Sequence, residues 1–369
     1  MSSASAAASA PVPTALLSMA GQSIWVDNIT RPMLDGPLQK LIAQWSVVGL
    51  TSNPTIFAKA IAGSADYDAP IAAMAARGMK EEEIFFTLAI EDLTRACELF
   101  AGVHARTGGV DGWCSLEVSP LLAYDARSTV EQAVALHARA GRPNLYIKVP
   151  GTPQGVPAIE ELVFRGIPVN VTLLFSTEQY LAAAEAYLRG LERRAQAGKE
   201  LRVEGVASLF ISRWDTAVDP KVPADLKART GLAVGADAYA AYTALYSGER
   251  WLRLEERGAR PQRLLFASTG TKDPALAPAY YVEGLAAPRT VNTMPEATLQ
   301  ALHAGGRIAG VLPPDGGPAR AALARIRAAG VDLAATAATL QKQGAEAFEK
   351  SWHDLLADIR TKSGALAAR

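Results

Sequence analysis

The sequence predicts a single α/β domain, a (β/α)8 TIM barrel of parallel strands with an additional C-terminal helix. Eight short apolar runs recur along the 369 residues, and most are followed by a segment with helical periodicity. This alternation is typical of βαβ units, and eight such units are the number that closes a barrel. The rival fold, an open doubly wound sheet, usually has a GxGxxG turn after its first strand, whereas the first run here continues as VDNITRP.

The predicted strands end at Asn, Ser, Thr, Gly or Pro, residues that favour turns. In chain order they are 23-SIWVDN, 46-SVVGLTSNP, 113-WCSLEVSP, 144-NLYIKVPGT, 167-IPVNVTLLFS, 205-GVASLFISR, 263-RLLFAST and 290-TVNTMP. The segments between them are long enough for helices, as in 178-EQYLAAAEAYLRGLERRAQAG.

The two ends of the chain have different compositions. Residues 1–14 are rich in Ala and Ser and lack the basic and long apolar regions of a secretion signal, so we expect a disordered tail. Residues 15–369 are then one barrel domain. From about Gly330 the chain is alanine-rich with helical spacing, which predicts a C-terminal helix that packs on the barrel.

Composition excludes several classes of function. Lys plus Arg and Asp plus Glu both number 37, so the chain lacks the basic surplus that non-specific binding to nucleic acid or anionic membranes requires. No apolar run is long enough to span a membrane. The two cysteines and four histidines are too scattered for a zinc site or a disulfide framework, and we expect reduced thiols and a cytoplasmic location. Small anionic substrates need only a local cluster of cations.

Three ionisable residues lie inside the apolar strand runs, close to their C-terminal ends. They are Asp27, Glu117 and Lys148. Turn chemistry accounts for the Asn, Ser and Thr residues at other strand ends, but charges that point into a core are rare unless they are paired. Because the chemistry of a (β/α)8 barrel takes place at the C-terminal ends of its strands, we interpret these three residues as a site.

A buried lysine at this place has a chemical use. Burial disfavours the ammonium form, and a neutral amine can add to a carbonyl to form a Schiff base. The iminium then accepts electrons as a carbon–carbon bond breaks, while two nearby carboxylates transfer protons. The alternative is a structural ion pair of Lys148 with Glu117 or Asp27. The surrounding polar strand ends favour the catalytic interpretation.

The sixth and seventh strands are followed by groups that suit an anion. Arg213 follows 207-ASLFIS, and 268-STGTK follows the seventh strand. Loops at this position often bind phosphate in such barrels, because small residues leave backbone N–H groups free. Arg213 can add a bidentate contact and Lys272 a point charge.

Taken together, these motifs resemble the transaldolase family, especially its longer bacterial form. The resemblance covers roughly residues 20 to 360. Its motifs follow in the family's order: 25-WVDNITRPMLDGPLQKLIAQWSVVGLTSNPTIFAKAI, LEVSP, YIKVPGT, NVTLLFS, SLFISRWD and FASTGTKDP. The resemblance implies a (β/α)8 barrel, in agreement with the strand pattern, and a Schiff-base mechanism that needs no metal and no cofactor.

The resemblance also implies a role for individual residues. Lys148 matches the Schiff-base lysine, and Asp27 matches the acid/base at the C4 hydroxyl. Glu117 and Thr172 match the pair that positions the water used to form and hydrolyse the carbinolamine. Asn53 and Asn170 match residues that hold hydroxyls of the dihydroxyacetone part, and Thr51 lies beside them as a further expected substrate contact. Ser208 matches a contact to a substrate hydroxyl, and Arg213 and Ser268 match contacts to the phosphate.

Two positions qualify this correspondence. The short transaldolases carry a second arginine where this chain has Gly270, and we expect Lys272, the nearest cation, to contact the phosphate instead. Phe210 matches an aromatic residue beside the active site, where it either packs the barrel or excludes water.

The implied reaction moves a dihydroxyacetone unit from sedoheptulose 7-phosphate to glyceraldehyde 3-phosphate, in the non-oxidative pentose phosphate pathway. The products are erythrose 4-phosphate and fructose 6-phosphate. The expected partners are sugar phosphates alone, with no nucleic acid and no membrane, in a monomer or homodimer. Two alternatives remain: a fructose-6-phosphate aldolase that releases free dihydroxyacetone, and a non-catalytic sugar-phosphate-binding barrel.

Overall fold

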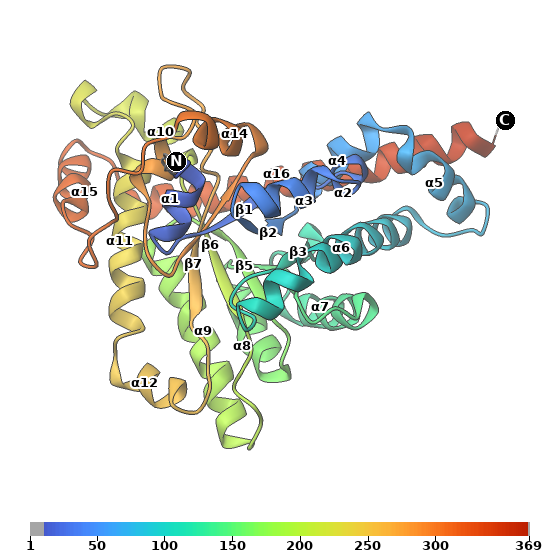
Figure 1. Ribbon diagram of the computed structural model, residues 1–369, viewed down its shortest axis with the longest axis horizontal. Coiled ribbons are helices and arrows are strands. Elements are labelled where there is room, and N and C mark those ends of the chain that lie inside the picture. The colour runs from blue at the N-terminus through green and yellow to red at the C-terminus, as the bar shows by residue number, and fades with distance from the viewer. Residues whose placement is uncertain (1–10, 368–369) are drawn as a thin grey trace, which may run out of the picture.

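Eight parallel strands form the centre of the computed structural model, which describes residues 11–367 (Figure 1). The strands are β1 (Ser23–Asp27), β2 (Val47–Thr51), β3 (Cys114–Glu117), β4 (Leu145–Pro150), β5 (Val169–Leu174), β6 (Gly205–Phe210), β7 (Gln262–Ala267) and β8 (Val291–Met294). Each overlaps one of the eight predicted runs, so the predicted fold is confirmed.

The strands follow one another around the sheet in the order β2-β1-β8-β7-β6-β5-β4-β3. The ring closes between β2 and β3 through a single bridge, in which Gly49 pairs with Trp113. There the amide of Leu50 donates to the carbonyl of Trp113 over 2.9 Å, and the amide of Gly112 donates to the carbonyl of Val48 over 2.7 Å. The sheet is therefore a barrel, whose strand ends converge on one mouth.

Helices surround the barrel (Figure 1). They are α1 (Pro13–Met19), α2 (Arg31–Leu34), α3 (Pro37–Gln44), α4 (Pro54–Gly63), α5 (Asp68–Ala75), α6 (Glu81–Arg106), α7 (Ala126–Ala140), α8 (Val156–Arg165), α9 (Thr177–Gln196), α10 (Arg213–Val218), α11 (Thr230–Leu245), α12 (Glu249–Glu255), α13 (Tyr280–Gly284), α14 (Glu296–Gly305), α15 (Ala319–Ala328) and α16 (Leu333–Ala367). Short 3-10 turns are η1 (Ala65–Tyr67), η2 (Pro120–Leu122), η3 (Asp219–Lys221) and η4 (Ala224–Leu226). Within the described chain, no helix is long and apolar enough to cross a membrane.

Three aromatic rings are stacked in the interior of the barrel. The ring of Tyr146 lies 4.1 Å from that of Trp113 and 6.0 Å from that of Trp25, measured between centroids. Gly49 makes room for them, since a Cβ at that position would lie 2.5 Å from Nε1 of Trp25. Tyr146 is two residues before Lys148 on β4, so the rings pack on the same side of the strand as the predicted catalytic lysine.

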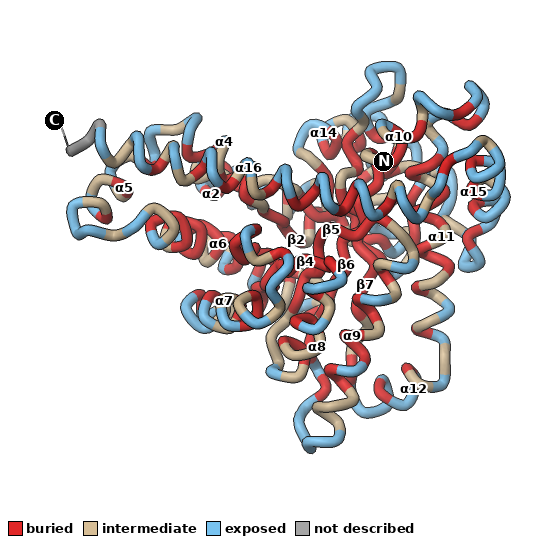
Figure 2. Tube along the Cα trace, turned by 180° about the vertical axis from the view of Figure 1, so that it is seen from behind, coloured by how far each residue is buried: buried red, intermediate tan, exposed pale blue. Residues whose placement is uncertain are grey.

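The predicted C-terminal helix is present as α16, which lies beside α4 and α5 (red in Figure 1). The face of α16 toward the barrel is buried, while the opposite face is exposed (Figure 2). Trp352 on this helix packs edge-on against Phe85 of α6, with centroids 5.0 Å apart, and the hydroxyl of Thr55 on α4 donates to that of Ser351 over 2.7 Å. The helix therefore covers part of the barrel mouth.

The predicted tail at residues 1–14 falls mostly on residues 1–10, which lie outside the described residues. Pro13 and Thr14 differ from the expectation, because they begin α1. Thr14 is fully buried, and its hydroxyl lies 3.0 Å from Nδ1 of His303. This contact fixes the chain upstream of the predicted domain boundary at residue 15.

Replacement of Gly49 by alanine tests the packing of the barrel interior. We expect Gly49→Ala to lower the free energy of unfolding by about 1–3 kcal/mol, because the new methyl group overlaps the Trp25 ring. Gly364→Ala is the control, since a Cβ on this exposed residue of α16 meets nothing within 4 Å and should cost no stability. Denaturant unfolding measures both, and equal stability of Gly49→Ala and the native protein would contradict the packing.

Candidate active site

Lys148 is buried on β4 with its ammonium inside the barrel mouth. Its Nζ donates to the backbone carbonyl of Ser52 over 3.1 Å and lies 3.2 Å from Oε2 of Glu117. The side chains of the lysine and the glutamate are only 6% and 8% exposed. Glu117 faces Lys148 because the two residues are paired in the β3–β4 register. The structure therefore brings these two predicted residues into direct contact.

Asp27 lies at the end of β1, opposite Thr51 in the β1–β2 register. The Thr51 hydroxyl donates to Oδ1 of Asp27 over 2.6 Å and lies 2.6 Å from the hydroxyl of Thr293. Burial raises the pKa of Asp27, although the positive charge of Lys148 and the Thr51 hydroxyl act in the opposite direction. An aspartate in this environment is suited to exchanging protons with a substrate.

The pKa of Glu117 is also raised by burial, and the nearby charge of Lys148 partly offsets this effect. The negative charge of Asp27 adds a smaller contribution that raises the pKa further. Folding therefore makes a proton on either carboxyl group more favourable than it is in water.

Asn170 and Ser208 form part of a buried hydrogen-bonded chain. Ser208 donates to Oδ1 of Asn170 over 2.7 Å, and Nδ2 of Asn170 donates to the hydroxyl of Ser115 over 3.1 Å. Two residues along β5, the hydroxyl of Thr172 is buried and has no hydrogen-bond partner among the described residues. A buried hydroxyl of this kind can bind a water molecule.

Asn53 has a structural role besides its predicted one. Its side-chain oxygen accepts a hydrogen bond of 3.0 Å from the amide of Ile56 and so caps the N-terminus of α4. The cap fixes the asparagine at the cavity, where its amide nitrogen can still donate to a substrate hydroxyl.

The predicted phosphate contacts lie together at the ends of β6 and β7. Arg213 is the first residue of α10, and its guanidinium lies 5.4 Å from the centroid of the Phe210 ring. Burial lowers the pKa of Arg213. Ser268 has a φ of 54°, in the left-handed region, and its hydroxyl lies 2.9 Å from that of Ser212. Such backbone strain in a non-glycine residue is frequent at functional sites.

A cavity of about 370 Å³ joins these groups. It is lined by nine of the predicted site residues: Asp27, Thr51, Asn53, Lys148, Ser208, Phe210, Arg213, Ser268 and Lys272. The other three stand next to it. Glu117 contacts Lys148, Asn170 is the backbone partner of Lys148, and Thr172 follows Asn170 on the same side of β5.

The cavity also contains residues that the sequence analysis did not assign. Thr293 extends the Asp27–Thr51 chain from β8, Lys59 comes from α4, and Phe348 comes from α16. Only Thr293 had a sequence signal, as a polar residue at a strand end. The position of Lys59 within a helix and the long sequence separation of Phe348 gave no indication of a role.

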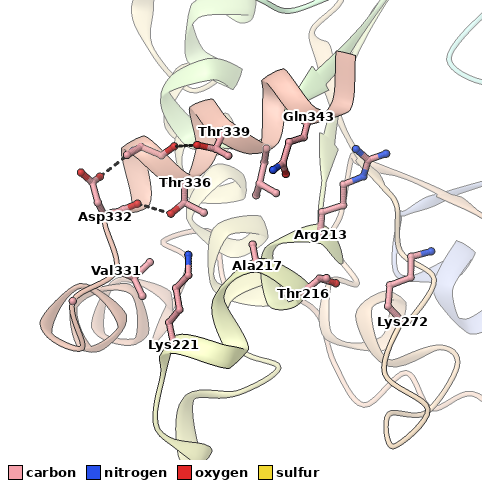
Figure 3. A pocket seen from close by; sticks show the side chains of 13 residues that line it. Arg213, Thr216, Ala217, Lys221, Lys272, Val331, Asp332, Thr336, Thr339 and Gln343 are labelled. Atoms are coloured by element: carbon pink, nitrogen blue, oxygen red, sulfur yellow. Dashed lines mark hydrogen bonds between the residues drawn. The ribbon is translucent and has the colours of Figure 1, made fainter. Parts of the chain in front are cut away.

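A larger groove of about 930 Å³ adjoins the cavity between α10 and the first turns of α16 (Figure 3). Arg213 and Lys272 line both spaces, and Lys221 lies farther along the groove. Among the described residues, none of these three cations forms an ion pair within 4.0 Å. They therefore remain free to bind an anion.

Metal ligands do not gather at the site. Within residues 11–367, no group of three or more His, Cys, Asp or Glu side chains is arranged to hold a metal ion. The chemistry available to the described residues comes from an amine, two carboxyl groups and several hydroxyls.

Residues 24–359 match the sequence model of the transaldolase/fructose-6-phosphate aldolase family. The chain belongs to this family of enzymes. It is 46% identical to a transaldolase from Thermobifida fusca, over 93% of this chain and 96% of the relative. It is 44% identical to a transaldolase from Frankia alni, over 95% and 98%, and 43% identical to one from Mycobacterium marinum, over 96% and 98%. Family membership thus agrees with the barrel and with the lysine–carboxylate cluster.

The raised pKa of Asp27 predicts a gain in stability when its charge is removed. Folding raises this pKa, so the stability contributed by the neutral carboxyl is lost as the pH rises through the folded-state value. Asp27→Asn cannot ionise and can still accept from Thr51. We expect a higher unfolding temperature than that of the native protein at neutral pH, with the difference disappearing as the pH falls below about 4.

Asp125→Asn provides a control of opposite sign. Hydrogen bonds from Ser128 lower the pKa of Asp125, so this variant should not gain stability at neutral pH. A lower unfolding temperature for Asp27→Asn at neutral pH would show that the charge of Asp27 stabilises the fold.

Proposed function

We propose that this protein is a transaldolase in which Lys148 forms the Schiff base. It transfers a dihydroxyacetone unit from a ketose phosphate such as sedoheptulose 7-phosphate to glyceraldehyde 3-phosphate, in the non-oxidative pentose phosphate pathway. The observation that carries the proposal is the buried contact of 3.2 Å between Glu117 and Lys148, beside the cavity that Lys148 and Asp27 line. The name shared by the relatives supports the same reaction.

The first step is addition of the lysine to the ketose. Burial raises the pKa of Glu117, so this carboxylate is suited to accept a proton from Lys148, which leaves a neutral amine. The amine adds to C2 of the substrate, and the carbinolamine loses water to give an iminium. A water molecule held between Glu117 and Thr172 takes part in these proton transfers.

The second step breaks the C3–C4 bond. Asp27 removes the proton of the C4 hydroxyl, the electrons of the broken bond move into the iminium, and the shorter aldose phosphate leaves. An acceptor aldehyde then binds, and C3 of the enamine attacks its carbonyl carbon. Asp27 returns its proton to the new alkoxide, and water hydrolyses the iminium, which releases the product and the Lys148 amine.

The other predicted residues hold the substrate in this geometry. Asn53, Asn170 and Ser208 can bind hydroxyls of the three-carbon unit, while Arg213 and Ser268 can bind the phosphate of either substrate. Lys272 lines the same cavity as these two residues, and this position supports its assignment as the second phosphate-binding cation.

The aldolase alternative uses the same lysine but lets water protonate the three-carbon enamine. Two apolar side chains that line the cavity, Phe210 and Phe348, argue for transfer because they reduce the access of water. We further propose a cytoplasmic enzyme that acts as a monomer or homodimer in one barrel domain; Cys97 and Cys114, both free and buried, agree with a reducing location.

Borohydride trapping tests the reactive lysine. With fructose 6-phosphate, reduction should fix a three-carbon adduct on Lys148, which peptide mass spectrometry locates. Lys148→Met should abolish the adduct, whereas Lys59→Met, which removes another lysine from the same cavity, should keep it. An adduct on a different lysine would refute the assignment, and a native protein without any adduct would refute the Schiff-base mechanism.

Removal of Lys272 tests the phosphate site. We expect Lys272→Ala to raise KM for glyceraldehyde 3-phosphate about tenfold, equivalent to about 1.4 kcal/mol, because a charge-assisted contact is lost. KM for free glyceraldehyde should stay within about twofold, since no phosphate contact is involved. Lys221→Ala, a change farther along the groove, is the comparison. Equal effects of Lys272→Ala on both acceptors would place the phosphate elsewhere.

A further inference from the structure

Gln341 is a buried polar residue on the otherwise apolar inner face of α16. Neighbours on that face are Ala337, Ala345 and Phe348, and Gln341 itself is only 6% exposed. At this position a leucine would satisfy the helical pattern. A buried amide is unfavourable unless its hydrogen-bonding groups find partners.

The amide of Gln341 joins the ends of two strands. Its Nε2 donates to the carbonyl of Gly151 over 3.0 Å and to the carbonyl of Leu173 over 2.8 Å. Gly151 in turn donates its amide proton to the carbonyl of Thr172 over 2.8 Å. The two protons of one side-chain amide therefore join two segments. One follows Lys148 at the end of β4, and the other follows Thr172 on β5.

The chain at Leu173 is strained. Its φ of 63° lies in the left-handed region, and the β5–β6 register shifts between Val171 and Leu174. Gly151 fits against this irregularity only because it has no side chain, since a Cβ there would lie 2.3 Å from Cδ2 of Leu174. Such bulges redirect a neighbouring side chain, and they persist only where surrounding contacts hold them.

Thr172 lies within this irregular part of β5. Asn170, two residues earlier, points into the barrel interior, where it contacts Ser115 and Ser208. Thr172 lies on the same side of β5, and its buried hydroxyl has no partner among the described residues. The hydroxyl is thus available to a water molecule, provided that the bulge keeps it there.

We propose that Gln341 is a positioning residue for the water steps of the reaction. By holding the carbonyls of Leu173 and Gly151, it keeps Thr172 where its hydroxyl and Glu117 can bind the reacting water. This inference rests on the proposed Schiff-base mechanism.

In hydrolysis, the water oxygen bonds to C2, its proton passes to the Glu117 carboxylate, and the iminium π electrons return to the Lys148 nitrogen. Glu117 then protonates that nitrogen, the electrons of the C2–N bond return to the nitrogen as the bond breaks, and the Lys148 amine leaves. The carbinolamine hydroxyl gives its proton to the Glu117 carboxylate as the ketone forms. Formation of the iminium is the reverse sequence, so Thr172 and Gln341 affect both directions equally.

Gln341→Met tests the proposal because it keeps the length of the side chain and removes both donors. We expect kcat about tenfold lower, the equivalent of about one hydrogen bond, with KM for phosphorylated substrates within about twofold. Borohydride quenching at successive times should show slower formation of the lysine adduct but the same final amount. Gln300→Met, a change of an exposed glutamine on α14 that lines neither the cavity nor the groove, is the control and should match the native protein.

Gln341→Glu adds a signature that packing alone does not produce. An ionised carboxylate cannot donate to either carbonyl, whereas its protonated form can donate to one. Activity relative to the native enzyme should therefore rise as the pH falls, while the ratio for Gln341→Met stays flat. Each variant is first checked for folding by circular dichroism. If only one variant folds, the proposal is judged on that variant alone: kcat and adduct formation for Gln341→Met, or the pH profile for Gln341→Glu.

Two results would overturn the proposal. One is a Gln341→Met enzyme with native kcat and a raised KM. That result would mean that the substitution displaces α16, which lies close to Arg213: a Cβ on Gly344 of this helix would be 3.3 Å from Nη1 of the arginine. The other is a pH profile of Gln341→Glu that parallels the native one. A native protein without transaldolase activity would instead refute the proposed function.

Discussion

The removal of three charges from water is the constraint on which this structure depends. Lys148, Glu117 and Asp27 lie in the barrel interior, where each charge is expensive unless neighbours compensate for lost hydration. The compensation comes from the register of the strands, which sets Glu117 beside Lys148 and Thr51 beside Asp27. Even so, burial has the largest effect on the pKa of both carboxyl groups and raises it. Folding thus makes protonation of both carboxyl groups more favourable than it is in water, and their ionisation costs the fold some stability.

Charge also varies along the cavity. The carboxyl groups lie at the strand ends around the lysine, whereas the cations Arg213 and Lys272 lie on the segments that follow β6 and β7. In the proposed function, the phosphate of the sugar binds at Arg213 and Lys272 while its carbonyl carbon reaches Lys148. Orientation therefore follows from electrostatics as well as from shape. The adjoining groove extends the same positive charge to Lys221.

The fold and the centre of the site could be predicted because both leave local signals. Apolar runs with turn residues reveal strands, and Lys148 inside such a run is conspicuous. Phe348 and Lys59 could not be predicted, because their contact with the cavity depends on how α16 and α4 pack across the mouth. Gln341 looks like an ordinary polar helix residue until its two carbonyl partners are known. The left-handed Leu173 has no signal either, since leucine rarely adopts that conformation.

The order of residues along the chain has a consequence for synthesis. All eight strands precede α16, so a ribosome completes the barrel sequence before it produces Gln341 and Phe348. Until then the nascent chain contains Lys148, but neither the Gln341 amide that donates to the Leu173 carbonyl nor the Phe348 ring that lines the cavity. Domains usually fold as their residues emerge. If Gln341 acts as proposed, a partly translated barrel would process sugars more slowly than the complete chain, which reaches its full rate only with the last helix.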